Sequence, residues 1–138
     1  MQISIVTLFP QMFIGPFDHS MVKKSIDKNL AKIEFVNIRD FGYGKHKVVD
    51  DKPYGGGRGM ILRVDVLEKA INNTKNKKKA AKNQRVILLD PHGKTFNQKK
   101  AEEFSKLEHL ILICGHYEGI DRRVDYFVDE KISIGDFI

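Results

Sequence analysis

Residues 85–90 read RVILLD and residues 109–114 read HLILIC, and these two runs decide the fold. Both are almost continuously apolar, a pattern typical of strands that are buried on both faces. Between them, residues 97–107 have the pattern of a helix, with Asn97 suited to be its N-cap. Buried strands that alternate with helices favour a parallel sheet. We therefore predict an α/β fold with a mostly parallel sheet flanked by helices.

The rest of the chain extends this alternation within a single domain. At 138 residues, with 41% hydrophobic and 30% charged residues, the chain fits one globular domain that can bury a core. Period-two and period-3.6 patterns give the other elements. The predicted strands are 2–9, 31–37 and 128–134, and the predicted helices are 16–30, 64–74 and 119–127.

Several features indicate a cytoplasmic protein without a membrane segment. No apolar run approaches the roughly 20 residues that a membrane-spanning helix needs. Residues 1–6, MQISIV, lack the basic region of a signal peptide. The single cysteine, Cys114, cannot form an intramolecular disulfide, and we interpret it as a small buried hydrophobic residue.

The net charge of +6 is unevenly distributed along the chain. Residues 72–100 hold nine lysines and arginines against one acid, Asp90, whereas acids outnumber bases after residue 100. The simplest interpretation of the lysine cluster at 75–82 is a solvated loop. The alternative is a contact with a polyanion such as RNA, because clustered lysines bind phosphates without regard to sequence.

The run DDKPYGGGRGM at residues 50–60 is the least regular part of the chain, and about twenty residues from Asp40 onward show no regular pattern. Glycine tolerates positive φ and lets a partner approach the backbone closely, and loops of this length are usually functional or disordered. Tyr54 offers a stacking surface and Arg58 a phosphate-binding guanidinium. An ordinary flexible connection is the alternative. The run lacks the Lys-Ser or Lys-Thr pair of a phosphate-binding loop.

Three glycine-containing turns follow apolar strands, at residues 89–93, 114–119 and 133–136. In a parallel sheet the ligand crevice lies beyond the carboxyl ends of the strands, where such turns gather. The alternative is that the glycines only serve the turns. The chain has no GxGxxG dinucleotide motif, and its five scattered histidines suggest no metal site.

Four segments together resemble a known family: residues 4–13 (SIVTLFPQMF), 50–60, 114–121 (CGHYEGID) and 133–136 (SIGD). They are similar to the bacterial tRNA (guanine-N1)-methyltransferases of the knotted methyltransferase superfamily, in the same order and over essentially the whole chain. The resemblance implies an α/β domain with a deep trefoil knot. It also implies methyl transfer from S-adenosylmethionine to N1 of the guanine just 3′ of the tRNA anticodon, by a homodimer.

The resemblance assigns site residues by position. Three knot loops would bind S-adenosylmethionine, the glycine run would contact tRNA or the target guanine, and Glu118 is the acid that we connect with the family's magnesium dependence. The cofactor residues are Leu89 and Pro91 in the first loop, Gly115, Tyr117, Glu118 and Gly119 in the second, and Ser133, Ile134, Gly135 and Phe137 in the third; the tRNA residues are Tyr54, Gly55, Gly56, Gly57 and Arg58.

The chain departs from the family after its third loop. In the family this loop continues into a threonine-diglycine-acid stretch, a knot-closing helix, a linker and a C-terminal domain, and the aspartate that serves as general base lies there, beyond Ile138. We therefore expect residues 1–138 to be the N-terminal cofactor-binding domain, with an incomplete knot and no activity alone. A noncatalytic RNA- or nucleotide-binding module is the competing hypothesis.

Overall fold

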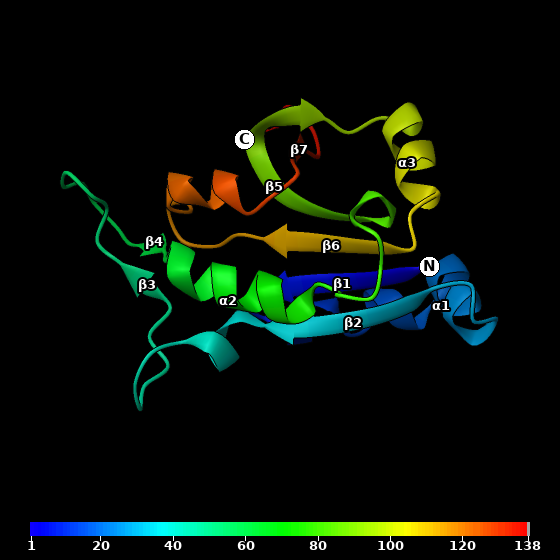
Figure 1. Ribbon diagram of the computed structural model, residues 1–138, viewed down its shortest axis with the longest axis horizontal. Coiled ribbons are helices and arrows are strands. Elements are labelled where there is room, and N and C mark those ends of the chain that lie inside the picture. Colours follow the sequence, from blue (N-terminus) through cyan, green and yellow to red (C-terminus); the bar gives the residue numbers. More distant parts are fainter. Residues whose placement is uncertain (138) are drawn as a thin grey trace.

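Five parallel strands form the central sheet of the computed structural model, which describes residues 1–137 (Figure 1). The strand order is β2-β1-β6-β5-β7, and every neighbouring pair is parallel. The predicted α/β fold with a mostly parallel sheet is confirmed, whereas the knot stays a prediction. The sheet contains β1 (Gln2–Thr7), β2 (Lys32–Asn37), β5 (Gln84–Thr95), β6 (His109–Cys114) and β7 (Glu130–Ser133), and the helices are α1 (Ser20–Asp27), α2 (Val64–Thr74) and α3 (Gln98–Ser105).

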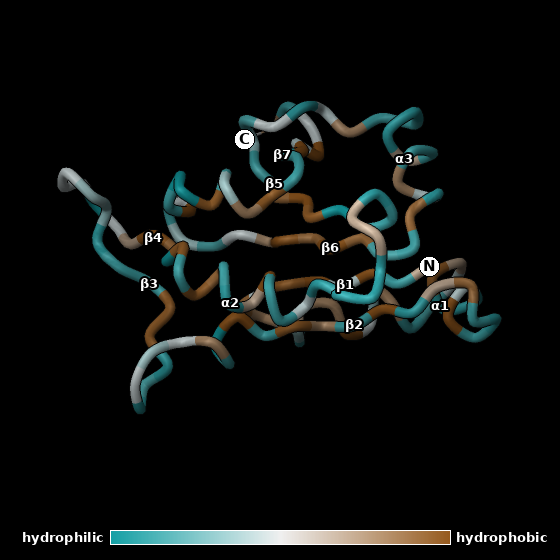
Figure 2. Tube along the Cα trace, in the orientation of Figure 1, coloured by the Kyte–Doolittle hydropathy of each residue, from teal (hydrophilic) through white to brown (hydrophobic). Residues whose placement is uncertain are grey.

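The core lies on both faces of the sheet. Side chains alternate between the faces along a strand, so Ile111 and Ile113 of β6 join the cluster that packs against α2, whereas Leu110 joins the cluster of Phe104 from α3. This is why the β6 run is continuously apolar. Figure 2 shows the hydrophobic residues that run along β1 and β6.

Two predicted helices are shorter than the sequence suggested. In place of one helix over 16–30, a 3₁₀ turn η2 (Pro16–Asp18) is followed by α1, because His19 between them is extended. In place of a helix over 119–127, only η5 (Arg122–Tyr126) is helical, and it is a 3₁₀ helix. Residues 119–121 are unavailable to a helix because they pair with the strand β4 (Ile61–Leu62). The other 3₁₀ turns are η1 (Pro10–Phe13), η3 (Ile38–Phe41) and η4 (Ala81–Asn83).

The strand β5 continues past the predicted break at Pro91. It follows β7 as far as Leu89, bulges outward, and resumes its pairing at Lys94. The bulge brings Gly93 against β7, where a Cβ atom would lie 2.5 Å from the backbone nitrogen of Ile132. Gly93 therefore permits the close strand contact, and the sequence break is a bulge rather than an end.

The remaining predicted elements are confirmed with small shifts in their ends. The helix over 64–74 has the predicted bounds, and Asn97 caps α3 by accepting a hydrogen bond from the Lys100 backbone N–H at 2.9 Å. The glycine run is irregular, but its two ends are paired. Strand β3 (Asp50–Asp51) is antiparallel to β4, so the run is the tip of a hairpin that projects from the sheet (Figure 1).

Candidate functional site

The three glycine-containing turns meet at one edge of the sheet. The second and third turns follow β6 and β7, whereas the first is the bulge within β5, and these three parallel strands are neighbours in the strand order. The bulge begins at Leu89, which pairs with Cys114 at the end of β6 and with Ile132 near the end of β7, so the three turns lie side by side where the crevice of a parallel sheet is expected. The structure thus brings together the three groups of residues that the sequence assigned to a cofactor, although it does not test that role.

The first turn has a half-buried Leu89 and an exposed Pro91. Between them Asp90 accepts hydrogen bonds from the backbone N–H of His92 at 2.8 Å and from its Nδ1 at 3.1 Å. Burial opposes the ionisation of Asp90, but these bonds outweigh it and hold the pKa of the carboxyl below its ordinary value. The first turn is therefore locked by its own side chains.

The second turn has an unusual backbone. Tyr117 has a φ of +64° and Gly119 a φ of +145°. Positive φ is uncommon for a bulky residue such as tyrosine, and strained residues of this kind cluster at functional sites. A Cβ atom on Gly119 would meet nothing within 4 Å, whereas one on Gly115 would lie 3.0 Å from Cδ1 of Ile120. The Gly119 backbone thus faces open space that a ligand can enter.

The third turn presents apolar side chains to solvent. Ile134 and Phe137 are 64% and 70% exposed, whereas Ser133 is buried. Ser133 Oγ holds the turn, because it donates to the Gly135 carbonyl at 3.1 Å and accepts from the Gly135 N–H at 3.3 Å. Exposed apolar side chains near the accessible Gly119 backbone could form one wall of a pocket for a heterocyclic ligand.

The glycine run is a built turn rather than a loose connection. The Gly56 N–H donates to the Pro53 carbonyl at 3.1 Å, and Gly55 has a φ of +86°, as the third residue of a type II turn requires. Gly57 also has a positive φ. Tyr54 and Arg58 are both exposed, so their side chains can contact a large ligand.

The hairpin lies directly against the second turn. The Glu118 N–H donates to the Met60 carbonyl at 3.2 Å, and the Leu62 N–H donates to the Gly119 carbonyl at 3.0 Å. Gly59, which the sequence analysis did not assign to the site, touches Glu118: a Cβ atom there would overlap Cγ of Glu118. The glycine hairpin and the second turn therefore form one continuous structure.

A cavity of about 230 Å³, with both charged and apolar side chains in its lining, lies between the hairpin and η5. Two ion pairs form its walls, Arg63 with Asp65 at 2.7 Å and Arg123 with Asp121 at 2.6 Å. The Arg63 hydrogen bonds lower the pKa of Asp65 to about 2, and the Arg123 hydrogen bonds lower the pKa of Asp121. The walls thus stay charged over the ordinary pH range.

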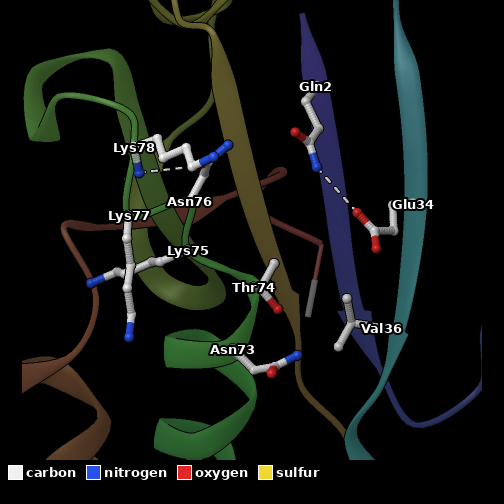
Figure 3. Close-up of a pocket in the computed structure, with 9 residues that line it drawn as sticks. All are labelled: Gln2, Glu34, Val36, Asn73, Thr74, Lys75, Asn76, Lys77 and Lys78. Carbon is white, nitrogen blue, oxygen red and sulfur yellow. Dashed lines mark hydrogen bonds between the residues drawn. The ribbon is translucent and has the colours of Figure 1, made fainter.

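The lysine cluster lies elsewhere, at the amino ends of the strands. Lys79 pairs with Glu108, the residue before β6, at 3.3 Å. A second cavity, of about 430 Å³, has Lys75, Lys77 and Lys78 on one side and the hydrogen-bonded Gln2 and Glu34 on the other (Figure 3). The cluster is therefore at the opposite sheet edge from the three turns.

Three further observations bear on the sequence predictions. Cys114 is half-buried rather than fully buried, and burial raises the pKa of its thiol. Within residues 1–137, no group of three or more His, Cys, Asp or Glu lies close enough together to hold a metal ion. No helix in the same range has both the length and the apolar character needed to cross a membrane.

Gly59 and Gly93 were not predicted from the sequence as site residues. At both positions a side chain would clash with another segment, with Glu118 at Gly59 and with β7 at Gly93, so only glycine allows the contact. Glycine at these positions was visible in the sequence, but its partners were not. His116, which packs edge-on against Phe9 with ring centroids 4.8 Å apart, connects the second turn to the end of β1 and was also missed.

Comparison with known proteins places the chain in a family. The model of the family described as tRNA (Guanine-1)-methyltransferase TrmD matches residues 1–138. Proteins named tRNA (guanine-N(1)-)-methyltransferase are similar over the whole of this chain. The one from Dictyoglomus turgidum is 51% identical, with 54% of its own length covered; those from Enterococcus faecalis and Clostridium botulinum are each 50% identical, with 56% and 55% covered.

This chain spans about half the length of the curated relatives it matches. The family model nevertheless matches it from its first residue to its last. The chain belongs to the tRNA (Guanine-1)-methyltransferase family.

Proposed function

We propose that the protein transfers a methyl group from S-adenosylmethionine to N1 of the guanine just 3′ of the anticodon in tRNA. One observation carries the proposal beyond family membership: the three turns that would hold the cofactor meet at one sheet edge, and the hairpin that would hold the guanine is bonded to the second of them. A methyl donor and its acceptor must meet, and these segments do.

The residues present fit S-adenosylmethionine. The half-buried Leu89 and the exposed Ile134 and Phe137 are apolar walls for the adenine ring, and the open backbone at Gly119 lets a ligand approach. Glu118 is an exposed acid in the second turn, suited to the cationic end of the ligand. When bound, the cofactor supplies a methyl group on a positively charged sulfur.

The reaction also defines what the protein must do to the guanine. As N1 accepts the methyl group that bound S-adenosylmethionine would supply, the N1 proton must pass to a base. Tyr54 and Arg58 on the hairpin are placed to hold the nucleotide by stacking and by its phosphate. No residue among 1–138 is assigned as the base, because the resemblance matches the family's aspartate to none of them.

The proposal includes three further properties. It includes a homodimer, and exposed Met12, Ile14 and Met21 give η1 and α1 an apolar surface that a second copy would cover. It places the enzyme in the cytoplasm with its tRNA. Magnesium dependence stays a prediction from the resemblance, and no step here passes through a metal.

Ligand-induced stabilisation distinguishes the enzyme from a noncatalytic RNA-binding module. S-adenosylmethionine and S-adenosylhomocysteine should each raise the melting temperature of the native-length protein, because a ligand at 100 times its Kd stabilises by about 2.7 kcal/mol. Methionine and adenosine, each lacking half of the ligand, serve as controls at the same concentration. An unchanged melting temperature with both full ligands would favour the RNA-binding module.

A further inference from the structure

The contact between Gly59 and Glu118 joins the two halves of the site. Gly59 has a φ of +83°, and the position of a Cβ atom there is already filled by Cγ of Glu118. Only a glycine allows the hairpin to lie this close to the second turn with its backbone in this conformation. The hairpin therefore rests, at Gly59 just before β4, on the methylene group of Glu118.

Backbone hydrogen bonds on both sides of this contact make it stiff. Met60 accepts from the Glu118 N–H, Gly119 accepts from the Leu62 N–H, and Leu62 accepts from the Asp121 N–H at 3.2 Å. Leu62 is fully buried in the main core. A shift of residues 117–121 is therefore passed to residues 59–62, because three hydrogen bonds and a side-chain contact would have to break for the segments to move separately.

The glycines at the tip of the hairpin make no such contact. Gly55 and Gly56 have the same positive φ of +86°, but a Cβ atom on either meets nothing within 4 Å. Seating of the hairpin against the second turn thus depends on Gly59 and not on the glycines at the tip. Gly55, which has a similar φ to Gly59 but no such contact, is therefore a matched control for Gly59.

We propose that Gly59 and Glu118 are positioning residues that couple the two ligands: the cofactor, by ordering the second turn, seats the hairpin for the guanine, and RNA bound to the hairpin in turn holds the backbone of the second turn in the conformation that binds the cofactor. This rests on the proposed function and adds a linkage between its two sites. Linkage is reciprocal, so each ligand must raise the affinity for the other by the same factor.

The coupling factor is measured with ligands that do not react. Calorimetry of the native-length protein gives the affinity for S-adenosylhomocysteine with and without an anticodon stem-loop RNA that carries the target guanine. We expect the RNA to raise that affinity at least about fivefold in the unchanged protein, the lower end of typical allosteric coupling. A factor of one would overturn the proposal. Failure of S-adenosylhomocysteine to bind at all would instead count against the proposed function.

Variants locate the coupling. Gly59→Ala should bring the factor close to one, whereas Gly55→Ala, which carries a similar φ and no contact, should keep it. Glu118→Gln retains the methylene groups and should keep the factor even if the affinity itself falls, whereas Glu118→Ala should lose it. Equal factors in Gly59→Ala and Gly55→Ala, or in the two Glu118 variants, would refute the coupling.

If Gly59→Ala does not fold, the comparison of Glu118→Gln with Glu118→Ala still tests the coupling. A shorter side chain at position 118 introduces no steric clash, so both of these variants should fold. The double variant Gly59→Ala with Glu118→Ala adds a second check. Removal of Cγ of Glu118 makes room for the new methyl group, so the melting temperature of the double variant should exceed that of Gly59→Ala alone. A double variant that is less stable than the single one would show that the two residues do not touch in solution.

Discussion

At the scale of single residues, the site depends on backbone conformations that few residue types adopt. Gly119, at φ +145°, lies in a region that is essentially restricted to glycine, and Tyr117 beside it is left-handed. Such conformations cost about 1–3 kcal/mol each for other residues and persist where the surrounding structure enforces them. Here the hairpin enforces them, since Met60 and Leu62 bond to the same turn.

Gly119→Val should weaken S-adenosylmethionine binding at least about tenfold and leave the protein folded. The valine cannot hold the native φ without strain, so the turn must change shape, yet its side chain has open space and displaces no core residue. Calorimetry measures the affinity and circular dichroism the fold. Gly44→Val, at a φ of +69° with nothing within 4 Å, is the control outside the three turns. Unchanged affinity in folded Gly119→Val would show that the second turn is misplaced.

His109 should make the fold sensitive to mild acid. It is fully buried, its Nε2 lies 2.8 Å from Ser4 Oγ, and its Nδ1 has no hydrogen-bond partner within residues 1–137. Burial lowers the pKa of His109 below its ordinary 6.5, Lys79 lowers it further, and Glu34 opposes them. The unfolded chain therefore binds the proton first as the pH falls.

The free energy of unfolding should consequently reach its full value above about pH 6.5, where His109 is neutral in both the folded and the unfolded chain. Below that pH, protonation of His109 in the unfolded chain should decrease it by at most about 1.4 kcal/mol per pH unit. Urea denaturation at pH 7 and pH 5 measures the decrease. His109→Gln should reduce the pH dependence, and the same change at exposed His19 is the control. An identical pH dependence in His109→Gln and the unchanged protein would exclude His109 as the cause.

At the scale of elements, the site is positioned by irregularities in the strands. The bulge of β5 carries the first turn, and the short pairing of β4 with residues 119–121 carries the second. Both replace what the sequence pattern predicts, a plain strand end and a helix. Each irregularity joins two segments that are far apart in the sequence: the bulge joins β5 to β7, and the short pairing joins β4 to residues 119–121.

Gly93→Ala should destabilise the fold through the contact between β5 and β7. The new methyl group would lie 2.5 Å from backbone atoms of Lys131 and Ile132, which cannot rotate away as a side chain can. Overpacking of this kind typically costs about 1–3 kcal/mol. Chemical denaturation measures the cost, with Lys94→Ala, an exposed position on the same strand, as the control. Equal stability of the two variants would mean that the bulge is more adaptable than described.

These elements also show how far the sequence alone reaches. The runs at 85–90 and 109–114 predict buried parallel strands because burial on both faces leaves a direct mark in the composition. Asn97 likewise marks a local event, the start of α3. Gly59 and Gly93 are different, since a glycine's need for space depends on Glu118 and on β7, whose positions only the fold determines. Local patterns are thus predictable, and contacts between distant segments are not.

At the scale of the whole molecule, the lysine cluster at 75–82 and the candidate site lie at opposite edges of the sheet. The three turns are at the carboxyl ends of the strands and the lysine cluster is at their amino ends. One of the lysines, Lys79, is already paired with Glu108. This separation favours the solvated-loop interpretation of the cluster over a contact with the RNA.

Changing Lys75, Lys77, Lys78 and Lys82 to Gln should therefore leave tRNA binding and its salt dependence unchanged. Each phosphate contact contributes about 0.7–0.9 to the slope of log affinity against log salt, so a lost contact is readily detected. Filter binding over a range of salt concentrations gives the slope. Arg58→Gln on the hairpin is the positive control and should make the slope shallower. A shallower slope in the four-lysine variant would show that the RNA extends to the amino edge of the sheet.

The most direct test of the whole account is the identity of the methylated atom. The native-length protein is incubated with S-adenosylmethionine and a tRNA that carries guanine 3′ of the anticodon, and the digested nucleosides are identified by mass spectrometry. The proposed function predicts 1-methylguanosine, at most one per tRNA, and none when that guanine is replaced by adenine. Transfer to another atom or another nucleotide, or no transfer by a folded protein that binds both ligands, would contradict it.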